Sequence, residues 1–461
     1  MYYLAVLCCL LIEAVRIRHG RGSLYAPRYP NWGLRGIAAA AAACVVLFAA
    51  RLALVYVASR DTRAPHWLAS LPIIAVFDYQ GFWWDPHRAL LGAGVGLAAA
   101  GCSFALYVLY GSLRARAFTG AARLIVVVAA VVLSLAALVA PAMGTTDPYL
   151  YAAYGELGLH AYGPQPIAAP CMDASLGDWC AQPTLPALYG PLYLTYVHVL
   201  LHAGGPLLLR IELLRLTNLG WVALFLILLR ALDVDWPLVA LAALNSAIFA
   251  QYVADAHNDI LAVDATLAGL VAARRHPVLG LICGAIAALL KLPFALLASV
   301  IFLRAPLKER LVWTAATLGV ALVLTLAWAG SPYLESVAYS RVHYPFFSSL
   351  AHNTAAISAF FFLFAALLRR RISLLGAYFI PTLGARSAYP WYALWSIPYI
   401  LWDRDRLALF LIGLPLTSFL METPFQLPLL WAVIMITLLG LCLRELVLPR
   451  DVARSGIGEK A

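Results

Sequence analysis

The feature that most constrains this chain is the recurrence of long apolar stretches of about 20 residues, the length at which a helix crosses a hydrocarbon core about 30 Å thick. Hydrophobic residues make up 64% of the 461 residues and charged residues only 12%, whereas soluble domains carry about 25% charged residues. We therefore predict an all-α integral membrane protein. The expected spans are 36–58, 89–110, 124–143, 216–232, 237–253, 256–273, 311–330, 351–368 and 427–446.

Several shorter apolar runs, many of them bounded by proline, lie between these spans. They are expected to form tilted or broken helices around a cavity, which gives about 12 to 15 membrane segments in total. Residues 1–446 are expected to form one polytopic domain and residues 447–461 a short cytoplasmic tail. The shorter runs are 278–290, 294–303, 374–385, 391–402 and 407–421.

Basic residues gather in short loops between the apolar runs, and Lys and Arg in such loops are retained on the cytoplasmic side. This distribution accounts for the net charge of +10, so no nucleic-acid partner is expected. The basic loops are 16–35, 111–123, 274–276, 304–310 and 369–371.

The longest loop, 144–186, contains no Lys or Arg and is expected on the opposite, extracytoplasmic side. The parity of the spans then requires that 187–203 does not fully cross, so it is expected as a re-entrant or interfacial helix within an extracytoplasmic segment 144–205. Cys171 and Cys180 lie in this loop and can pair if it faces an oxidising compartment.

Asp147 begins an Asp-Pro-Tyr segment directly after the span 124–143. A carboxylate at a membrane boundary near apolar groups can gain basicity, which favours a general base that accepts a proton from an acceptor hydroxyl. The alternative is an aspartate that caps the next helix, with Pro148 at its first position. The segment alone leaves both interpretations open.

Further polar residues fall at the same predicted interface. Tyr151 and Tyr189 suit a sugar-binding surface, or they belong to the aromatic belt of a membrane protein. His257, Asn258 and Asp259 open the helix expected at 256–273, where they either hydrogen-bond a ligand or cap the helix. No compact set of further metal ligands accompanies them, so a divalent metal such as Mg or Mn stays an open question.

Cations on this face suggest an anionic ligand that arrives from the lipid, with snorkelling to lipid headgroups as the alternative. Lys291 is isolated between apolar runs, where a phosphate would offset the cost of its charge. The arginines would bind phosphate oxygens in a bidentate manner. The other candidates are Arg341, His343, Arg386, Trp391 and Tyr392.

The order of these motifs resembles that of the C superfamily of glycosyltransferases over roughly residues 140–400. Within it, the chain is most similar to the bacterial polyprenyl-phosphate-mannose-dependent alpha-mannosyltransferases of cell-envelope glycan synthesis. The motifs are Asp-Pro-Tyr at 147–149, Tyr-Gly-Pro at 189–191, His-Asn-Asp at 257–259, Lys-Leu-Pro at 291–293 and Pro-Trp-Tyr-Ala-Leu-Trp at 390–395.

The resemblance implies a multipass fold in the bacterial plasma membrane, with a polyprenyl phosphate hexose as donor and an extracytoplasmic glycan or glycolipid as acceptor. It implies direct displacement with inversion, with Asp147 as the base and Lys291 and Arg386 beside the donor phosphate. His257, Asn258 and Asp259 would line the donor or acceptor site. The family often has a second acid in the first loop, and Glu156 or Asp173 could take that place.

Three other classes compete with this interpretation. Broken helices around a cavity also describe transporters and lipid-linked sugar flippases, although carriers place their ionisable residues near the midplane. O-antigen ligases and polymerases also use polyprenyl-linked sugars, but they centre on a large late loop. A structural membrane subunit would tolerate replacement of Asp147 apart from an effect on stability.

Overall fold

The described part of the protein is entirely helical. A computed structural model describes residues 33–60, 119–140, 147–164, 186–202 and 205–343 and, in part, 94–113 and 394–403. Its helices are α2 (Gly33–Arg60), α5 (Gly120–Leu138), α6 (Asp147–Leu157), η1 (Gly158–Ala161), α8 (Pro191–Leu201), α9 (Leu207–Ala231), α10 (Trp236–Ala243), α11 (Ser246–Ile248), η3 (Phe249–Ala254), α12 (Asp259–Ala272), α13 (Pro277–Leu290), η4 (Leu292–Leu297), α14 (Ala298–Ile301), α15 (Leu307–His343) and α18 (Ile397–Asp403).

Four of these helices are long and apolar enough to cross a membrane, namely α2, α5, α9 and α15. They correspond to four of the expected spans. The start of α9 was predicted nine residues too late, at 216, because the polar residues in its first turns interrupt the apolar pattern. The bent pair α10 and α11–η3 would make a fifth span. The expected total of about 12 to 15 segments stays a prediction, because much of the C-terminal third lies outside the described residues.

The stretch expected as one span at 237–253 is broken rather than continuous. The axis of its second half is bent by 45° from that of its first half. Asn245 caps the second half by accepting a hydrogen bond from the backbone N–H of Ala247 at 3.0 Å, and the segment then continues as the π-helix η3. π-Helical turns are rare and occur often at functional sites.

Polar side chains of α9 satisfy backbone carbonyls at the C-terminal end of η3 and in the turn after it. Arg215 Nε donates to the carbonyl of Ala254 at 2.9 Å, and Asn218 Nδ2 donates to the carbonyls of Tyr252 and His257 at 2.8 and 3.0 Å. Irregular backbone at membrane depth requires partners of this kind, because lipid offers none. The two residues therefore hold the chain in place just before Asp259.

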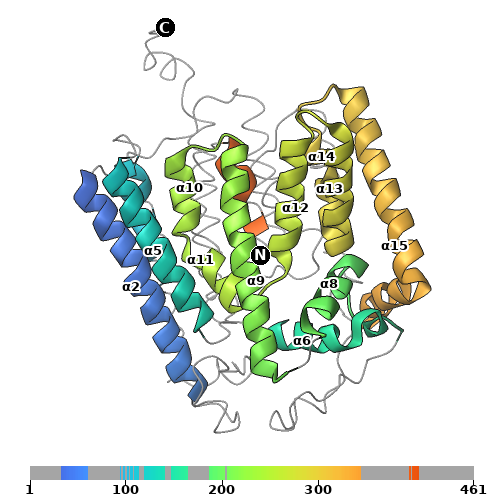
Figure 1. Ribbon diagram of the computed structural model, residues 1–461, viewed down its shortest axis with the longest axis horizontal. Coiled ribbons are helices and arrows are strands. Elements are labelled where there is room, and N and C mark those ends of the chain that lie inside the picture. Colours follow the sequence, from blue (N-terminus) through green and yellow to red (C-terminus); the bar gives the residue numbers. More distant parts are fainter. Residues whose placement is uncertain are drawn as a thin grey trace, which may run out of the picture.

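α12 and α13 form a hairpin, so the first residue of α12 and the residue after α13 lie at the same end of the molecule (Figure 1). α6 and α8 lie at that end, beneath the hairpin in this view. Each has 11 residues, which is about half the length that a span requires. The helix expected at 187–203 is thus present as α8, and its interfacial position stays a prediction.

α15 bends near its C-terminal end, where Gly330 has a φ of 60° and Pro332 follows. The span expected at 311–330 ends at this bend. Beyond it, Tyr333 packs against Tyr162 with ring centroids 5.2 Å apart, and Ser336 Oγ accepts a hydrogen bond from the backbone N–H of Gly163 at 2.8 Å. The bend therefore attaches α15 to the segment that follows α6.

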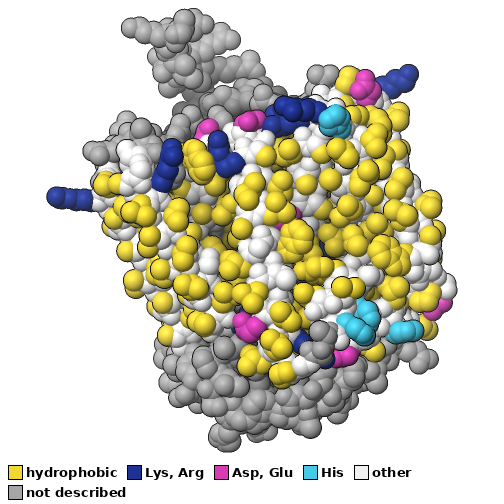
Figure 2. Space-filling view, in the orientation of Figure 1, with side chains coloured by type: hydrophobic (Ala, Val, Ile, Leu, Met, Phe, Trp, Pro, Cys, Tyr) yellow, Lys and Arg dark blue, Asp and Glu magenta, His cyan; other side chains and the backbone are white. Residues whose placement is uncertain are grey.

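The surface has the character of a membrane protein. Apolar side chains cover the middle of the face shown in Figure 2, and Lys and Arg side chains gather at its upper end. Val46, Val199 and Val323 are 64%, 71% and 64% exposed. Such contiguous apolar exposure suits a lipid environment.

Candidate active site

Asp147 is the first residue of α6 and the centre of a cluster of polar side chains. α6 places Tyr151 one turn further on, and the Tyr151 hydroxyl donates to Asp147 Oδ2 at 2.9 Å. Tyr151 is fully buried, whereas the Asp147 side chain keeps 20% of its exposure. The carboxylate is thus held from one side and reachable from another.

His257 approaches the same carboxylate oxygen from the other side. Its Nδ1 lies 3.1 Å from Asp147 Oδ2, and its side chain is completely buried. The preceding residue, Ala256, has a φ of 50°, a conformation that is uncommon for a residue other than glycine. This turn directs the chain from η3 into α12 and presents His257 to α6.

Asn258 occupies the N-cap position of α12, but its side chain makes no capping hydrogen bond. Its Oδ1 instead lies 3.5 Å from the oxygen of the Tyr151 hydroxyl, whose single proton is directed to Asp147. The capping interpretation of the His-Asn-Asp motif therefore does not describe Asn258, whose side chain faces the cluster around Asp147.

Lys291 and Asp259 form a buried ion pair across the α12–α13 hairpin. Lys291 Nζ lies 2.5 Å from Asp259 Oδ1, and the Asp259 side chain is fully buried. The ammonium group also lies over the rings of Tyr189 and Trp395, at 5.5 and 5.1 Å from their centroids. In the structure the lysine charge is offset by a protein carboxylate and two aromatic faces.

The Tyr-Gly-Pro motif at 189–191 brings α8 onto the end of α13. The backbone N–H of Gly190 donates to the carbonyl of Leu290 at 3.0 Å, and a Cβ at this glycine would lie only 1.9 Å from the Leu289 carbonyl oxygen. Only glycine permits this approach. It positions Tyr189, whose hydroxyl donates to that of Tyr151 at 3.4 Å.

Tyrosine rings line the side of the cluster formed by α6 and α8. Tyr151 and Tyr189 meet edge to face at 5.4 Å between centroids, and Tyr193 packs against both at 5.4 and 5.2 Å. The Tyr162 hydroxyl donates to the backbone carbonyl of Tyr189 at 2.7 Å. These contacts fix the ring of Tyr189 next to Tyr151, with the ammonium group of Lys291 over its face.

The electrostatic environment lowers the pKa of Asp147. Burial acts to raise the pKa, but the hydrogen bond and charge of His257, the hydrogen bond of Tyr151 and the charge of Lys291 outweigh it. The sequence favoured a raised pKa for Asp147, whereas in the structure this pKa is lowered. The reason is that the neighbours stabilise the ionised form more strongly than burial destabilises it.

Glu156 does not join the cluster. It lies nine residues after Asp147 on α6, which at about 100° per residue puts it on the opposite face of the helix. There it forms an ion pair with Arg210 of α9. Of the two acids of α6, only Asp147 therefore lies with His257 and Lys291.

The remaining candidates are placed only in part. Arg341 and His343 belong to the last turn of α15, and the structure describes their backbone alone. Cys171, Cys180 and Asp173 lie outside the described residues, as do Arg386, Trp391 and Tyr392. Among the residues that the structure does describe, no three His, Cys, Asp or Glu side chains are grouped as a metal site.

Sequence reasoning missed Arg215, Asn218 and Gly190 as residues that shape the site. The first two carried a usable signal, since polar side chains inside an apolar helix are costly without partners. Gly190 carried none, because the identical Tyr-Gly-Pro sequence at 162–164 makes no close approach.

We expect Lys291→Met to destabilise the protein by about 3 kcal/mol, because it leaves the buried Asp259 carboxylate without its ammonium partner. Adding Asp259→Asn should restore part of this loss, since the amide carries no charge. Thermal unfolding of the purified single and double variants measures the effect. Additive losses in the double variant would show that the two groups are not coupled.

A comparison with known protein families finds a match to the part of the chain that holds this cluster. The family model described as alpha-(1->6)-mannopyranosyltransferase, N-terminal domain, matches residues 68–306. That range includes Asp147, Tyr189, His257 and Lys291. The comparisons with curated proteins and with solved structures gave no match.

Proposed function

Because the chain belongs to the alpha-(1->6)-mannopyranosyltransferase family, we propose that it transfers mannose from a polyprenyl phosphate donor to an extracytoplasmic glycan or glycolipid. Membership makes the protein a glycosyltransferase, and the resemblance to alpha-mannosyltransferases is confirmed. The lipid donor, the acceptor, the α-1,6 linkage, the C-superfamily fold, the bacterial plasma membrane and the roles of individual residues belong to the proposal.

The observation that carries the proposal is the position of Asp147. Its carboxylate accepts from Tyr151 and contacts His257, both buried, while its own side chain keeps 20% exposure. It lies at the start of an 11-residue helix outside the candidate spans. A base for a hydroxyl of a water-soluble glycan requires this combination of fixed orientation and access.

In the proposed reaction the acceptor hydroxyl attacks the anomeric carbon of mannose as its proton passes to Asp147. The new C–O bond forms while the bond to the phosphate oxygen breaks, and the polyprenyl phosphate leaves with the electron pair. Direct displacement inverts the anomeric centre, so an alpha product requires a beta-linked donor. Because the pKa of Asp147 is lowered, the carboxylate is ionised and ready at neutral pH.

Lys291 is the proposed partner of the donor phosphate. An ammonium group has three N–H donors, so a phosphate oxygen would share it with Asp259, which lies 2.5 Å away. Charge stabilisation of the leaving phosphate would lower the barrier. Asp259 is then the residue that holds Lys291 in place.

The test is mannose transfer by the purified protein in lipid nanodiscs. Radiolabelled mannosyl polyprenyl phosphate and GDP-mannose are compared as donors, with an α-1,6-linked oligomannoside as acceptor. We expect extension of the acceptor from the lipid donor alone, with a product that an α-1,6-specific mannosidase degrades. Transfer from GDP-mannose would overturn the proposed donor. In a parallel assay with sealed proteoliposomes, movement of the lipid between leaflets without transfer would favour a flippase.

The Tyr151→Phe variant tests the electrostatics of the proposed base. The hydroxyl that it removes lowers the pKa of Asp147, so its loss should raise that pKa. The acid limb of the kcat/KM profile should then move to higher pH, with turnover at the plateau reduced by about tenfold or less. Rates measured from about pH 4 to pH 8 report the shift. An unchanged acid limb would show that the Tyr151 hydroxyl does not influence the pKa of the catalytic base.

A further inference from the structure

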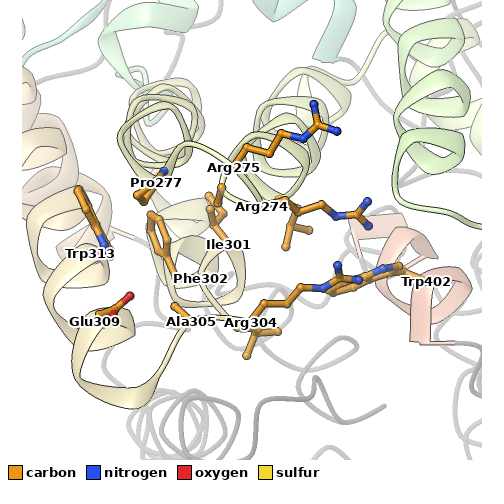
Figure 3. Close-up of a pocket in the computed structure, with 13 residues that line it drawn as sticks. Arg274, Arg275, Pro277, Ile301, Phe302, Arg304, Ala305, Glu309, Trp313 and Trp402 are labelled. Atoms are coloured by element: carbon orange, nitrogen blue, oxygen red, sulfur yellow. The ribbon is translucent and has the colours of Figure 1, made fainter.

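A cavity of about 310 Å³ opens at the end of the α12–α13 hairpin that is remote from Asp147 (Figure 3). It lies between the end of α12, the start of α13, α14, the start of α15 and α18. α12 has 14 residues, so its two ends are separated by about 20 Å. The cavity is therefore a second site, apart from the cluster that the proposed reaction uses.

Among the described residues that line this cavity, three are arginines and one is an acid. The arginines are Arg274, Arg275 and Arg304, and the acid is Glu309 of α15. Figure 3 shows the three guanidinium groups on the side toward α18, with Glu309 across the cavity from them. The side that faces α18 is thus strongly cationic.

The charge of Arg274 is only partly compensated. Its Nη1 donates to the carbonyl of Ala231 at 3.0 Å and to Asp233 at 2.9 Å. The Asp233 side chain is 78% exposed, and an ion pair with so exposed a partner contributes little. The buried Nε and Nη2 of Arg274 have no hydrogen-bond partner among the residues that the structure describes.

The remaining walls are apolar and aromatic. Arg304 lies over the ring of Trp402, with the guanidinium carbon 5.7 Å from its centroid. Ile301, Phe302 and Trp313 form the opposite part of the lining. Phe302 and Trp313 stack with centroids 6.1 Å apart. A ligand of this cavity would therefore carry an anionic group beside hydrocarbon.

The position of the cavity along the helices fits a membrane interface. The basic sequence Arg274-Arg275-His276 and the loop at 304–310 lie at this end of the molecule, where Figure 2 shows Lys and Arg side chains above the apolar belt. Tryptophan favours the same depth. Basic pockets between membrane helices at this level bind anionic lipid headgroups.

We propose that this cavity binds the phosphate headgroup of an anionic phospholipid. The phosphate oxygens would lie among the three guanidinium groups, which present paired N–H donors suited to bidentate contact. The start of an acyl chain would lie along Phe302 and Trp313 and leave the protein toward the lipid-facing side of α15. The proposal does not depend on the sugar-transfer reaction.

Native mass spectrometry of the purified protein with added short-chain phosphatidylglycerol tests the proposal. Arg304→Gln removes one guanidinium group of the cavity together with its contact over the Trp402 ring, and it should weaken binding of one lipid by about tenfold. Arg275→Gln, at an exposed side chain, provides a second variant. Lys308→Gln is the control, because this exposed residue is at the same end and carries the same charge but does not line the cavity.

Three arms distinguish the outcomes. Phosphatidylglycerol should bind at least about tenfold more tightly than phosphatidylcholine of equal chain length, and only the cavity variants should lose that preference. If Lys308→Gln lost the preference for phosphatidylglycerol to the same extent, the effect would be one of net charge, and the proposed lipid site would be wrong. Displacement of the lipid by inorganic phosphate at matched concentration would make this a site for free phosphate and overturn the lipid assignment.

Discussion

Asp147→Asn should reduce mannose transfer by about a hundredfold to ten-thousandfold while the protein folds as before. The amide has the shape of the carboxylate, but it cannot accept the proton of an attacking hydroxyl, and general base catalysis contributes a factor of this size. The Tyr151 hydroxyl retains an oxygen to which it can donate. The measurement is initial velocity with saturating lipid donor, at equal amounts of folded protein.

Glu156→Gln is the matched control, since it makes the same chemical change on the same helix. Glu156 lies on the opposite face of α6 and pairs with Arg210 of α9, so its loss should affect thermal stability rather than turnover per folded molecule. If Asp147→Asn kept full turnover and Glu156→Gln lost it, the assignment of the base would be wrong. A normal KM for the donor with a reduced kcat would support a role in the chemical step.

Gly190→Ala should be the most destabilising single methyl substitution in the described part of the chain. The added Cβ would lie 1.9 Å from the Leu289 carbonyl oxygen and 2.5 Å from its carbonyl carbon. Neither atom belongs to a flexible side chain, so α8 must move away from α13 and break the hydrogen bond between Gly190 and Leu290. A loss of about 3 kcal/mol or more in unfolding free energy is expected, as for other overpacked positions.

Gly163→Ala is the control for Gly190→Ala, because the two glycines have the same neighbours in sequence but different surroundings in the fold. Both glycines stand between tyrosine and proline, yet a Cβ at Gly163 would have no atom of the described residues within 4 Å. It should therefore leave the melting temperature nearly unchanged. Because the displacement in Gly190→Ala also moves Tyr189 away from Lys291, transfer should fall in that variant even below its melting temperature. Equal melting temperatures for the two variants would refute the close approach of α8 and α13.

The sequence by itself determined the class of this protein and the location of several membrane helices. Apolar length is a local property, so α2, α5 and the straight part of α15 could be predicted without knowledge of their neighbours. The family likeness was also accessible, because motif order along the chain does not require contacts. The same is true of the candidate residues themselves, since ionisable side chains are conspicuous in an apolar chain.

Only the tertiary structure decided which of those residues meet. Asp147 and Glu156 are both acids of one helix, but they have different partners. Asp147 contacts His257 in the turn before α12, whereas Glu156 pairs with Arg210 of α9. The stretch expected as a continuous span at 237–253 is broken between Ala243 and Ser246, where Asn245 caps the second half. The irregular backbone at its far end, in η3 and the turn after it, is satisfied by Arg215 and Asn218 of another helix.

The pairing of Lys291 shows the same limit. Read along the chain, it is an isolated cation that requires a phosphate or a lipid headgroup. The hairpin of α12 and α13 returns it to the level of Asp259, whose carboxylate lies 2.5 Å away. Apolar length and motif order are local, so sequence carries them. The partner of a buried charge depends on which segments pack together. An unpaired buried charge is costly, so it pairs with an opposite charge that the fold brings close in space.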